Sequence, residues 1–145
     1  MVDFAKQMKK WATKTEKDIA AVTVDIITEL ARTVTFRTPI GDPTLWQSMP
    51  PAGYIPGTLI NNWFSSIDVP NNGPLRAPNS FAVDTFADIE KTARMAPGHV
   101  FYFQNPVRYA WRIEFGWSSQ APKGMVRLSV RNFDTIAKRA MRKHL

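Results

Sequence analysis

The run from Asp3 to Thr35, DFAKQMKKWATKTEKDIAAVTVDIITELARTVT, decides the fold of this chain. Residues spaced by three and four positions fall on one side of a helix, and that side is largely apolar here. Its members are Phe4, Met8, Trp11, Thr15, Ile19, Val22, Ile26 and Leu30. Neither Pro nor Gly interrupts the run, and Asp3 is a suitable N-cap. The sequence therefore predicts one long helix over residues 3–35.

Such a helix would be about 50 Å long, at about 1.5 Å per residue. A compact domain of 145 residues is narrower than that. Part of the helix must therefore project from the domain, break, or be covered by another chain.

The composition bounds the class of protein. A chain of 145 residues favours one domain, residues 1–145. It has no Cys, which excludes disulfides, thiolate zinc sites, iron–sulfur clusters and a Cys nucleophile. The two histidines, His99 and His144, are 45 positions apart, so we expect neither a metal nor a cofactor. No apolar run reaches the roughly 18–20 residues of a membrane span, and residues 1–17 do not read as a signal peptide. We expect a basic cytosolic protein without membrane contact.

The net charge of +7 is concentrated at the two ends of the chain. Residues 1–17 carry a net +3 and residues 121–145 a net +6, whereas residues 18–120 carry −2. Three interpretations stay open: solvated helix faces, contact with nucleic-acid phosphates, and contact with an acidic surface of a partner subunit. The residues that could contact DNA or a partner in this way are Lys138, Arg139, Arg142 and Lys143.

Residues 37–58 are rich in Pro and Gly, which disfavours both a helix and a central strand. We predict an extended loop or arm here, and loops of this length are usually functional. Its aromatic residues Trp46 and Tyr54 either fold back on their own domain or insert into a neighbour. With Trp63 they are the candidate contacts between subunits, where aromatic side chains are enriched.

The rest of the chain alternates short strands and helices. We predict strands from about Trp63 to Val69 and over 81–86, 100–103 and 125–130, helices over 86–96, 107–115 and 131–143, and a turn over 70–80. The fold class is therefore α+β: a long N-terminal helix, a small antiparallel or mixed sheet with helices packed on one face, a C-terminal helix and an extended proline-rich arm.

No constellation of catalytic residues is visible. His99 has no nucleophile motif near it in sequence, and His144 lies at the terminus. Asp88 and Glu90, two positions apart, point to different faces of a helix. Glu114 lies among aromatic residues with Arg108 and Arg112 near it in sequence, and is better interpreted as half of a structural ion pair than as an acid–base catalyst. We expect a protein that is not an enzyme.

Two stretches resemble a known family. The first is RTPIGDPTLW at 37–46, continued by PAGY at 51–54 and the Asn62-Trp63 step; the second is YAWRIEFG at 109–116, followed by QAPKGMV at 120–126. As an ordered set they resemble the neck, or tail-completion, proteins of tailed bacteriophages, the head–tail joining proteins of the minor tail protein Z type.

The resemblance implies a structural virion protein that forms a ring in the neck of the particle and has no catalytic residues. Its implied partners are copies of itself, the head connector or adaptor, the tail terminator or tube proteins, and genomic DNA that passes through the channel without sequence specificity. Its implied location is the virion, and the host cytoplasm during assembly. The alternative is a small basic nucleic-acid-binding protein.

Overall fold

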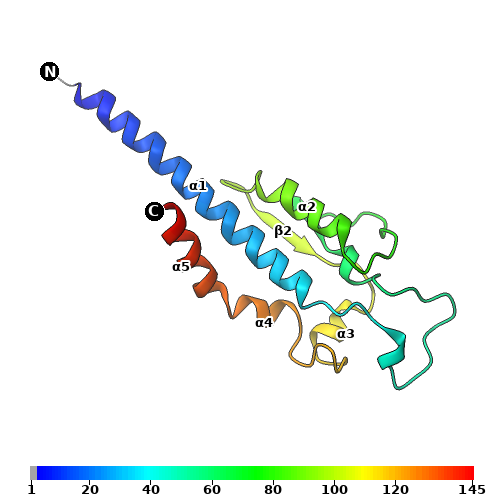
Figure 1. Ribbon diagram of the computed structural model, residues 1–145. Coiled ribbons are helices and arrows are strands. Elements are labelled where there is room, and N and C mark those ends of the chain that lie inside the picture. The colour runs from blue at the N-terminus through cyan, green and yellow to red at the C-terminus, as the bar shows by residue number, and fades with distance from the viewer. Residues whose placement is uncertain (1–2) are drawn as a thin grey trace.

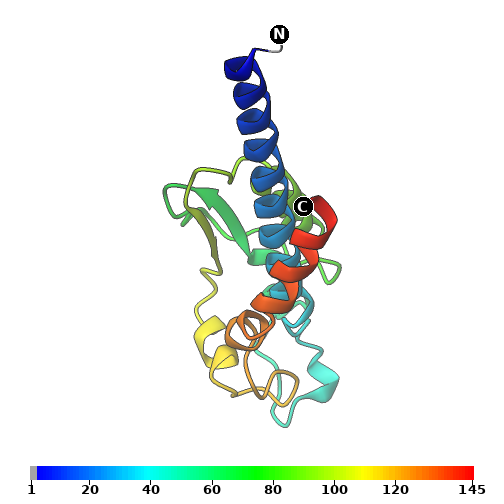
Figure 2. The same ribbon diagram turned by 90° about the vertical axis from the view of Figure 1, so that its left-hand side faces the viewer.

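A helix of 33 residues, α1 (Phe4–Phe36), begins at one end of the molecule and ends among the other elements, beyond which the loop that follows it extends (Figure 1). The structure is a computed structural model and describes residues 3–145. The Asp3 carboxylate accepts a hydrogen bond from the Ala5 N–H at 3.0 Å, as expected of the N-cap. The N-terminal part of α1 extends past every other element (Figures 1 and 2), and residues 3–14 are all exposed. The predicted long helix is confirmed, and part of it projects.

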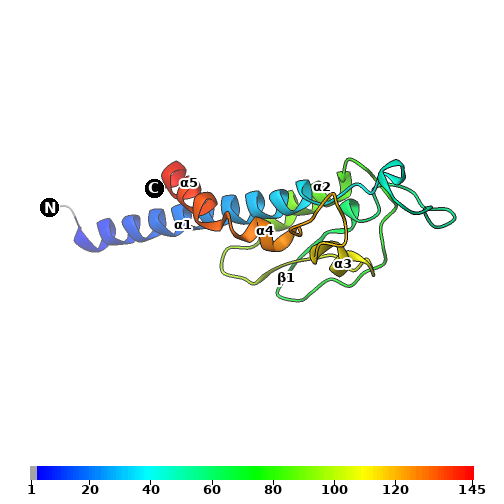
Figure 3. The same ribbon diagram turned by 90° about the horizontal axis from the view of Figure 1, so that it is seen from below.

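The remaining elements make the protein α+β. They are the 3₁₀ turns η1 (Pro43–Leu45) and η2 (Ile60–Asn62), the strands β1 (Phe64–Ile67) and β2 (Phe101–Gln104), and the helices α2 (Val83–Ala93), α3 (Ala110–Glu114), α4 (Val126–Val130) and α5 (Phe133–His144). The strands pair antiparallel, with Phe64 opposite Gln104 and Ile67 opposite Phe101. α2 packs against both α1 and β1. Seen from below, α4 and α5 follow α1 along its side (Figure 3).

The core joins the C-terminal end of α1 to segments that follow much later in the chain. Its buried members are Val34, Leu59, Trp63, Val107, Ala121 and Met125. Phe103, Tyr109 and Ile113 are partly buried and pack against this cluster. The core thus holds the segments after β2 against the base of the projecting helix.

A buried polar network fixes the segment between β1 and α2. Asn61 and Asn62 are both fully buried. The Asn61 Oδ1 atom accepts hydrogen bonds from the backbone N–H groups of Asp84 at 3.1 Å and Thr85 at 3.4 Å. The Asn62 Oδ1 atom accepts one from the Arg76 N–H at 2.7 Å. These two amides hold the irregular segment 70–82 in place.

Two predicted strands are wrong. Residues 81–86 form a turn and the start of α2, which begins at Val83 because Asn61 satisfies its first N–H groups from outside the helix. Residues 125–130 form α4, although their apolar and polar residues alternate as in a strand. The predicted helix over 107–115 is shorter and covers only Ala110–Glu114.

Within residues 3–145, no helix has both the length and the apolar character that crossing a membrane requires.

Candidate interaction surfaces

The projecting part of α1 carries an apolar stripe that stays exposed among residues 3–145. The stripe consists of Phe4, Met8, Trp11 and Ile19, which are all exposed. Trp11 is 63% exposed and Phe4 74%. Large apolar side chains in a continuous row on a helix are an interaction surface more often than a neutral one. The stripe is therefore the first candidate surface.

The C-terminal helix α5 uses part of its positive charge inside the chain. Arg139 forms an ion pair with Glu29 on α1. The Lys143 Nζ atom and the His144 Nε2 atom lie 2.9 Å and 2.8 Å from the Asp25 carboxylate, also on α1. Ile136 and Ala140, both buried, lie on the same helix as these cations. Two of the four basic residues predicted to face DNA or a partner, Arg139 and Lys143, thus anchor α5 to α1.

The other two basic residues of that set have no such role. Lys138 and Arg142 are exposed, and in the described part of the chain neither has a carboxylate within 4.0 Å. They remain available to solvent or to a partner.

We expect the docking of α5 to weaken in acid. The hydrogen bond from Lys143, assisted by His144, holds the pKa of Asp25 below its usual value. A carboxyl group whose pKa is lowered by folding stabilises the fold above its unfolded pKa, near 3.9, and that stability is lost as the pH falls through the folded pKa. The melting temperature of the wild type should therefore decrease as the pH is lowered past about 4. The melting temperature of Asp25→Asn should decrease less steeply in that range, although this variant should be less stable at pH 7. Identical pH profiles for the two proteins would contradict this role of Asp25.

The loop 39–57 is folded on itself. The Trp46 and Tyr54 rings pack together with centroids 4.7 Å apart, and the Tyr54 hydroxyl donates to the Gly41 carbonyl at 2.9 Å. Both rings are half-buried. Apart from the 3₁₀ turn η1 the segment has no regular structure, as predicted. Trp46 and Tyr54 therefore contact each other within the loop, and their contact with a second chain stays a prediction.

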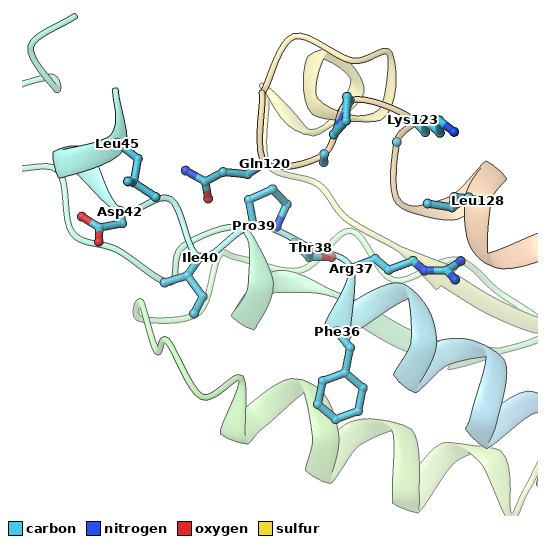
Figure 4. Close-up of a pocket in the computed structure, with 13 residues that line it drawn as sticks. Phe36, Arg37, Thr38, Pro39, Ile40, Asp42, Leu45, Gln120, Lys123 and Leu128 are labelled. Atoms are coloured by element: carbon cyan, nitrogen blue, oxygen red, sulfur yellow. The ribbon is translucent and has the colours of Figure 1, made fainter. Parts of the chain in front are cut away.

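A groove lies between the end of α1, this loop and residues 120–128 (Figure 4). Its volume is about 550 Å³. Phe36, Ile40 and Leu45 line it and are exposed, and Gln120 and Lys123 also line it. The lining is mainly apolar, with two cations, Arg37 and Lys123, and one carboxylate, Asp42. This composition favours binding of a chain segment over chemistry.

The prediction that Trp63 contacts another subunit is wrong. Its side chain is 4% exposed, its ring stacks on Phe103 with centroids 5.0 Å apart, and its Nε1–H donates to Thr38 Oγ1 at 2.9 Å. Trp63 is a core residue, because the turn η2 before it directs the ring inward rather than along an exposed strand.

An aromatic patch lies at the other end of the molecule, around α3. It consists of Trp111, Phe115 and Trp117, all exposed. The Arg112 guanidinium lies 5.2 Å from the Trp117 ring, and that of Arg127 lies 4.6 Å from the Phe115 ring. These cation–π contacts orient the patch without covering it.

The segment from Tyr109 to Gly116 forms α3 and the turn that ends it. Tyr109 and Ile113, four positions apart, pack against the core, whereas Trp117, the next residue at that spacing, remains exposed. Burial, with a smaller effect of nearby Tyr54, raises the pKa of Tyr109 to about 12, so this hydroxyl stays neutral. Gly116 ends the turn with φ +86°, a conformation that favours glycine.

Glu114 caps α4 from a distance. Its carboxylate accepts hydrogen bonds from the backbone N–H groups of Met125, Val126 and Arg127 at 2.8 to 3.0 Å, and its Oε1 atom lies 3.1 Å from the Arg127 Nε atom. Burial raises the pKa of Glu114, but these donors outweigh burial and hold it below its usual value. Glu114 is half of a structural ion pair, as interpreted from sequence, but its partner lies 13 positions away.

We expect Glu114→Ala to destabilise the fold by about 2–3 kcal/mol, because three amides of α4 lose their acceptor at once. Glu114→Gln keeps one acceptor oxygen but loses the charge, so its cost should be intermediate. Chemical denaturation measures both changes. Removal of the partner side chain by Arg127→Ala is the control and should cost less than Glu114→Ala, since the amides keep their acceptor. The reverse order would contradict the capping role.

No catalytic or metal site emerges from the geometry. In the part of the chain that the structure describes, no three His, Asp or Glu side chains gather closely enough to hold a metal ion. The His99 Nδ1 atom lies 2.8 Å from the exposed Asp68 carboxylate, which also accepts from the Val100 N–H at 3.0 Å. This pair lies at the end of the two-stranded sheet where Ile67 pairs with Phe101. No family model, curated protein or solved structure matches the chain.

Proposed function

We propose that this protein is a structural subunit of the neck of a tailed bacteriophage, which assembles with copies of itself into a ring around the DNA channel. One observation carries the proposal: two different apolar surfaces lie at opposite ends of the molecule, the apolar stripe of α1 and the aromatic patch around α3 (Figure 1). A ring requires a head-to-tail contact between two unlike surfaces, and these two supply such a pair.

The contacts of the family-like motifs support a structural role. The stretches 109–116 and 120–126 belong to one unit, since Glu114 in the first caps the helix that begins at the end of the second. Gly124 allows the close approach of the two, because a Cβ atom there would lie 2.8 Å from the Glu114 Oε1 atom. The motif residues therefore have packing and capping functions, and the proposed role requires no catalysis.

The proposal extends to partners and location. The loop 39–57 is proposed to reach the neighbouring subunit as an arm, with Trp46 and Tyr54 at the contact. The ring would lie between the head connector or adaptor and the tail terminator or tube proteins, in the virion and, during assembly, in the host cytoplasm.

Localisation in the particle tests the proposal. Cryo-electron microscopy of particles that contain the chain should place it as a closed ring at the head–tail joint. Phe4→Glu should prevent joining while leaving the subunit folded, because the Phe4 side chain is 74% exposed on the projecting part of α1. Val69→Glu, also at an exposed apolar residue, is the matched control and should join normally. Absence of the chain from complete particles, or a position elsewhere, would reject the proposal.

The alternative function, a nucleic-acid-binding monomer or dimer, is favoured by the lysines of α1. The size of the species separates the two. A neck protein forms a closed ring in the particle. A nucleic-acid-binding protein instead acts as a monomer or dimer, and its function depends on its DNA affinity alone.

A further inference from the structure

We infer that one face of the projecting part of α1 binds the phosphate backbone of nucleic acid. The face is a lysine row made of Lys6, Lys10, Lys14 and Lys17. At about 100° per residue, these four residues fall within an arc of about 80° on the helix, and they extend over about 16 Å along it. That length corresponds to about five base-pair steps of duplex DNA.

The charges of the lysine row are free to act outside the chain. In the described part of the chain only Lys14 has a carboxylate partner, Asp18 at 2.7 Å, and this pair is exposed. Such a surface pair is worth about 0–1 kcal/mol, so a phosphate can replace it. The contrast with α5 is clear, where Arg139 and Lys143 already neutralise Glu29 and Asp25.

The shape of the face also suits an extended ligand. A shallow groove of about 790 Å³ runs along it, lined by the four lysines together with Gln7, Lys9, Trp11 and Thr13. No acidic side chain lines the groove. Lysines act as point charges without the planar fork that reads bases, so the row is suited to backbone contact without sequence specificity.

The position of the apolar stripe argues for nucleic acid over a membrane surface. On a helix lying in a membrane interface, the apolar stripe faces the lipid and the opposite face points to solvent. Lys6, Lys10 and Lys17 lie on the side of α1 away from Phe4 and Met8, about 140° to 180° around the helix from the middle of those two. Lipid contact through the stripe would therefore direct these lysines away from the lipid phosphates. The two faces serve two different partners.

This inference rests on the proposed function in one respect: the proposed function identifies the bound nucleic acid as the genomic DNA of the particle. The binding itself is a property of the subunit and is measured on the purified full chain. A fluorescent random duplex of about 25 base pairs is titrated with protein at KCl concentrations from about 50 to 300 mM, and log Kobs is plotted against log salt. The slope should be about −3 to −4 for four phosphate contacts.

Two triple variants with equal net charge locate the site. Lys6→Gln/Lys10→Gln/Lys17→Gln should flatten the slope by about 2 to 3 and weaken binding at least about tenfold at the lowest salt. Lys123→Gln/Lys138→Gln/Arg142→Gln removes three exposed cations elsewhere and should leave the slope within about one of the wild-type value. Circular dichroism of both variants confirms that α1 remains helical.

Three results would overturn the inference. The first is that the protein does not bind the duplex, and the second is that both triple variants lose the same amount of DNA binding. The third is that the lysine-row variant loses binding to phosphatidylglycerol vesicles but keeps its binding to DNA. Ring formation in the particle is scored separately with the Phe4→Glu variant, because Phe4 is not among the residues that line the lysine groove. DNA binding through the lysine row by a chain that is absent from the neck would reject the proposed function and leave this inference standing.

Discussion

Trp63→Ala should lower the free energy of unfolding by about 3–5 kcal/mol, the cost of removing a large aromatic side chain from a core. The ring is 4% exposed and stacks on Phe103, so its removal leaves a cavity among Val34, Val107 and Met125. It also leaves the Thr38 hydroxyl without its donor. Chemical denaturation of the isolated subunit measures the loss, and the midpoint should shift far below that of the wild type.

Trp11→Ala is the control for that experiment. It removes the same side chain from an exposed position on a helix and should change the stability by no more than about 0.5 kcal/mol. Trp63→Phe keeps the stack on Phe103 and loses the Nε1 hydrogen bond, so its effect should lie between the two. A stable Trp63→Ala subunit would restore Trp63 as a candidate for contacts between subunits.

Gly124→Ala should destabilise the fold strongly, through both backbone strain and a collision. Gly124 has φ +83°, which costs a residue with a Cβ atom about 1–2 kcal/mol. The new Cβ atom would also lie 2.8 Å from the Glu114 Oε1 atom and closer still to the Glu114 carbonyl oxygen. The Glu114 carboxylate must then move off the amides of α4, so we expect a total loss of about 3 kcal/mol or more.

Gly98→Ala separates the backbone strain from the collision. Gly98 has nearly the same φ, +80°, but nothing lies within 4 Å of its added Cβ atom. Its substitution should therefore cost only the strain, about 1–2 kcal/mol. Thermal melts of the two variants side by side should differ clearly, and equal melting temperatures would show that the approach of Glu114 to Gly124 contributes nothing.

Elements defined by neighbouring residues were predictable from the sequence. The spacing in residues 3–35 places α1 to within one residue at its C-terminal end, and Asp3 caps it as the sequence indicated. The strands near Trp63 and at 100–103, and the C-terminal helix, follow from local patterns in the same way. In each of these, the residues that specify the element lie inside it or next to it.

Helices whose first backbone N–H groups are hydrogen-bonded by a side chain distant in the sequence were not predictable. Residues 125–130 alternate as a strand does, yet a carboxylate 11 positions earlier holds their first amides in a helical turn. Residues 81–86 begin a helix because Asn61, more than 20 positions earlier, accepts from their amides. Trp63 was misassigned for a related reason, since its donor partner Thr38 and its stacking partner Phe103 lie 25 and 40 positions away.

The candidate surfaces were likewise predictable only in part. The basic character of both ends of the chain was visible in the composition, but which cations remain free was not. Arg139 and Glu29 are 110 positions apart, and only the packing of α5 on α1 brings them together. Lys138 and Arg142 of α5 remain free, but the larger group of free cations is the lysine row of α1, which the sequence had not singled out.

The remote caps also bear on the order in which the chain is made. Asn61 and Glu114 both precede the helices that they cap, by 23 and 11 positions. As the chain emerges from the ribosome in N-to-C order, each acceptor is therefore already present when the amides that need it arrive. The contacts of α1 follow the opposite order. Val34 packs against Ala121 and Met125, and Asp25 pairs with Lys143, all of which are synthesised long after α1. The first helix synthesised is therefore the last to be fully packed.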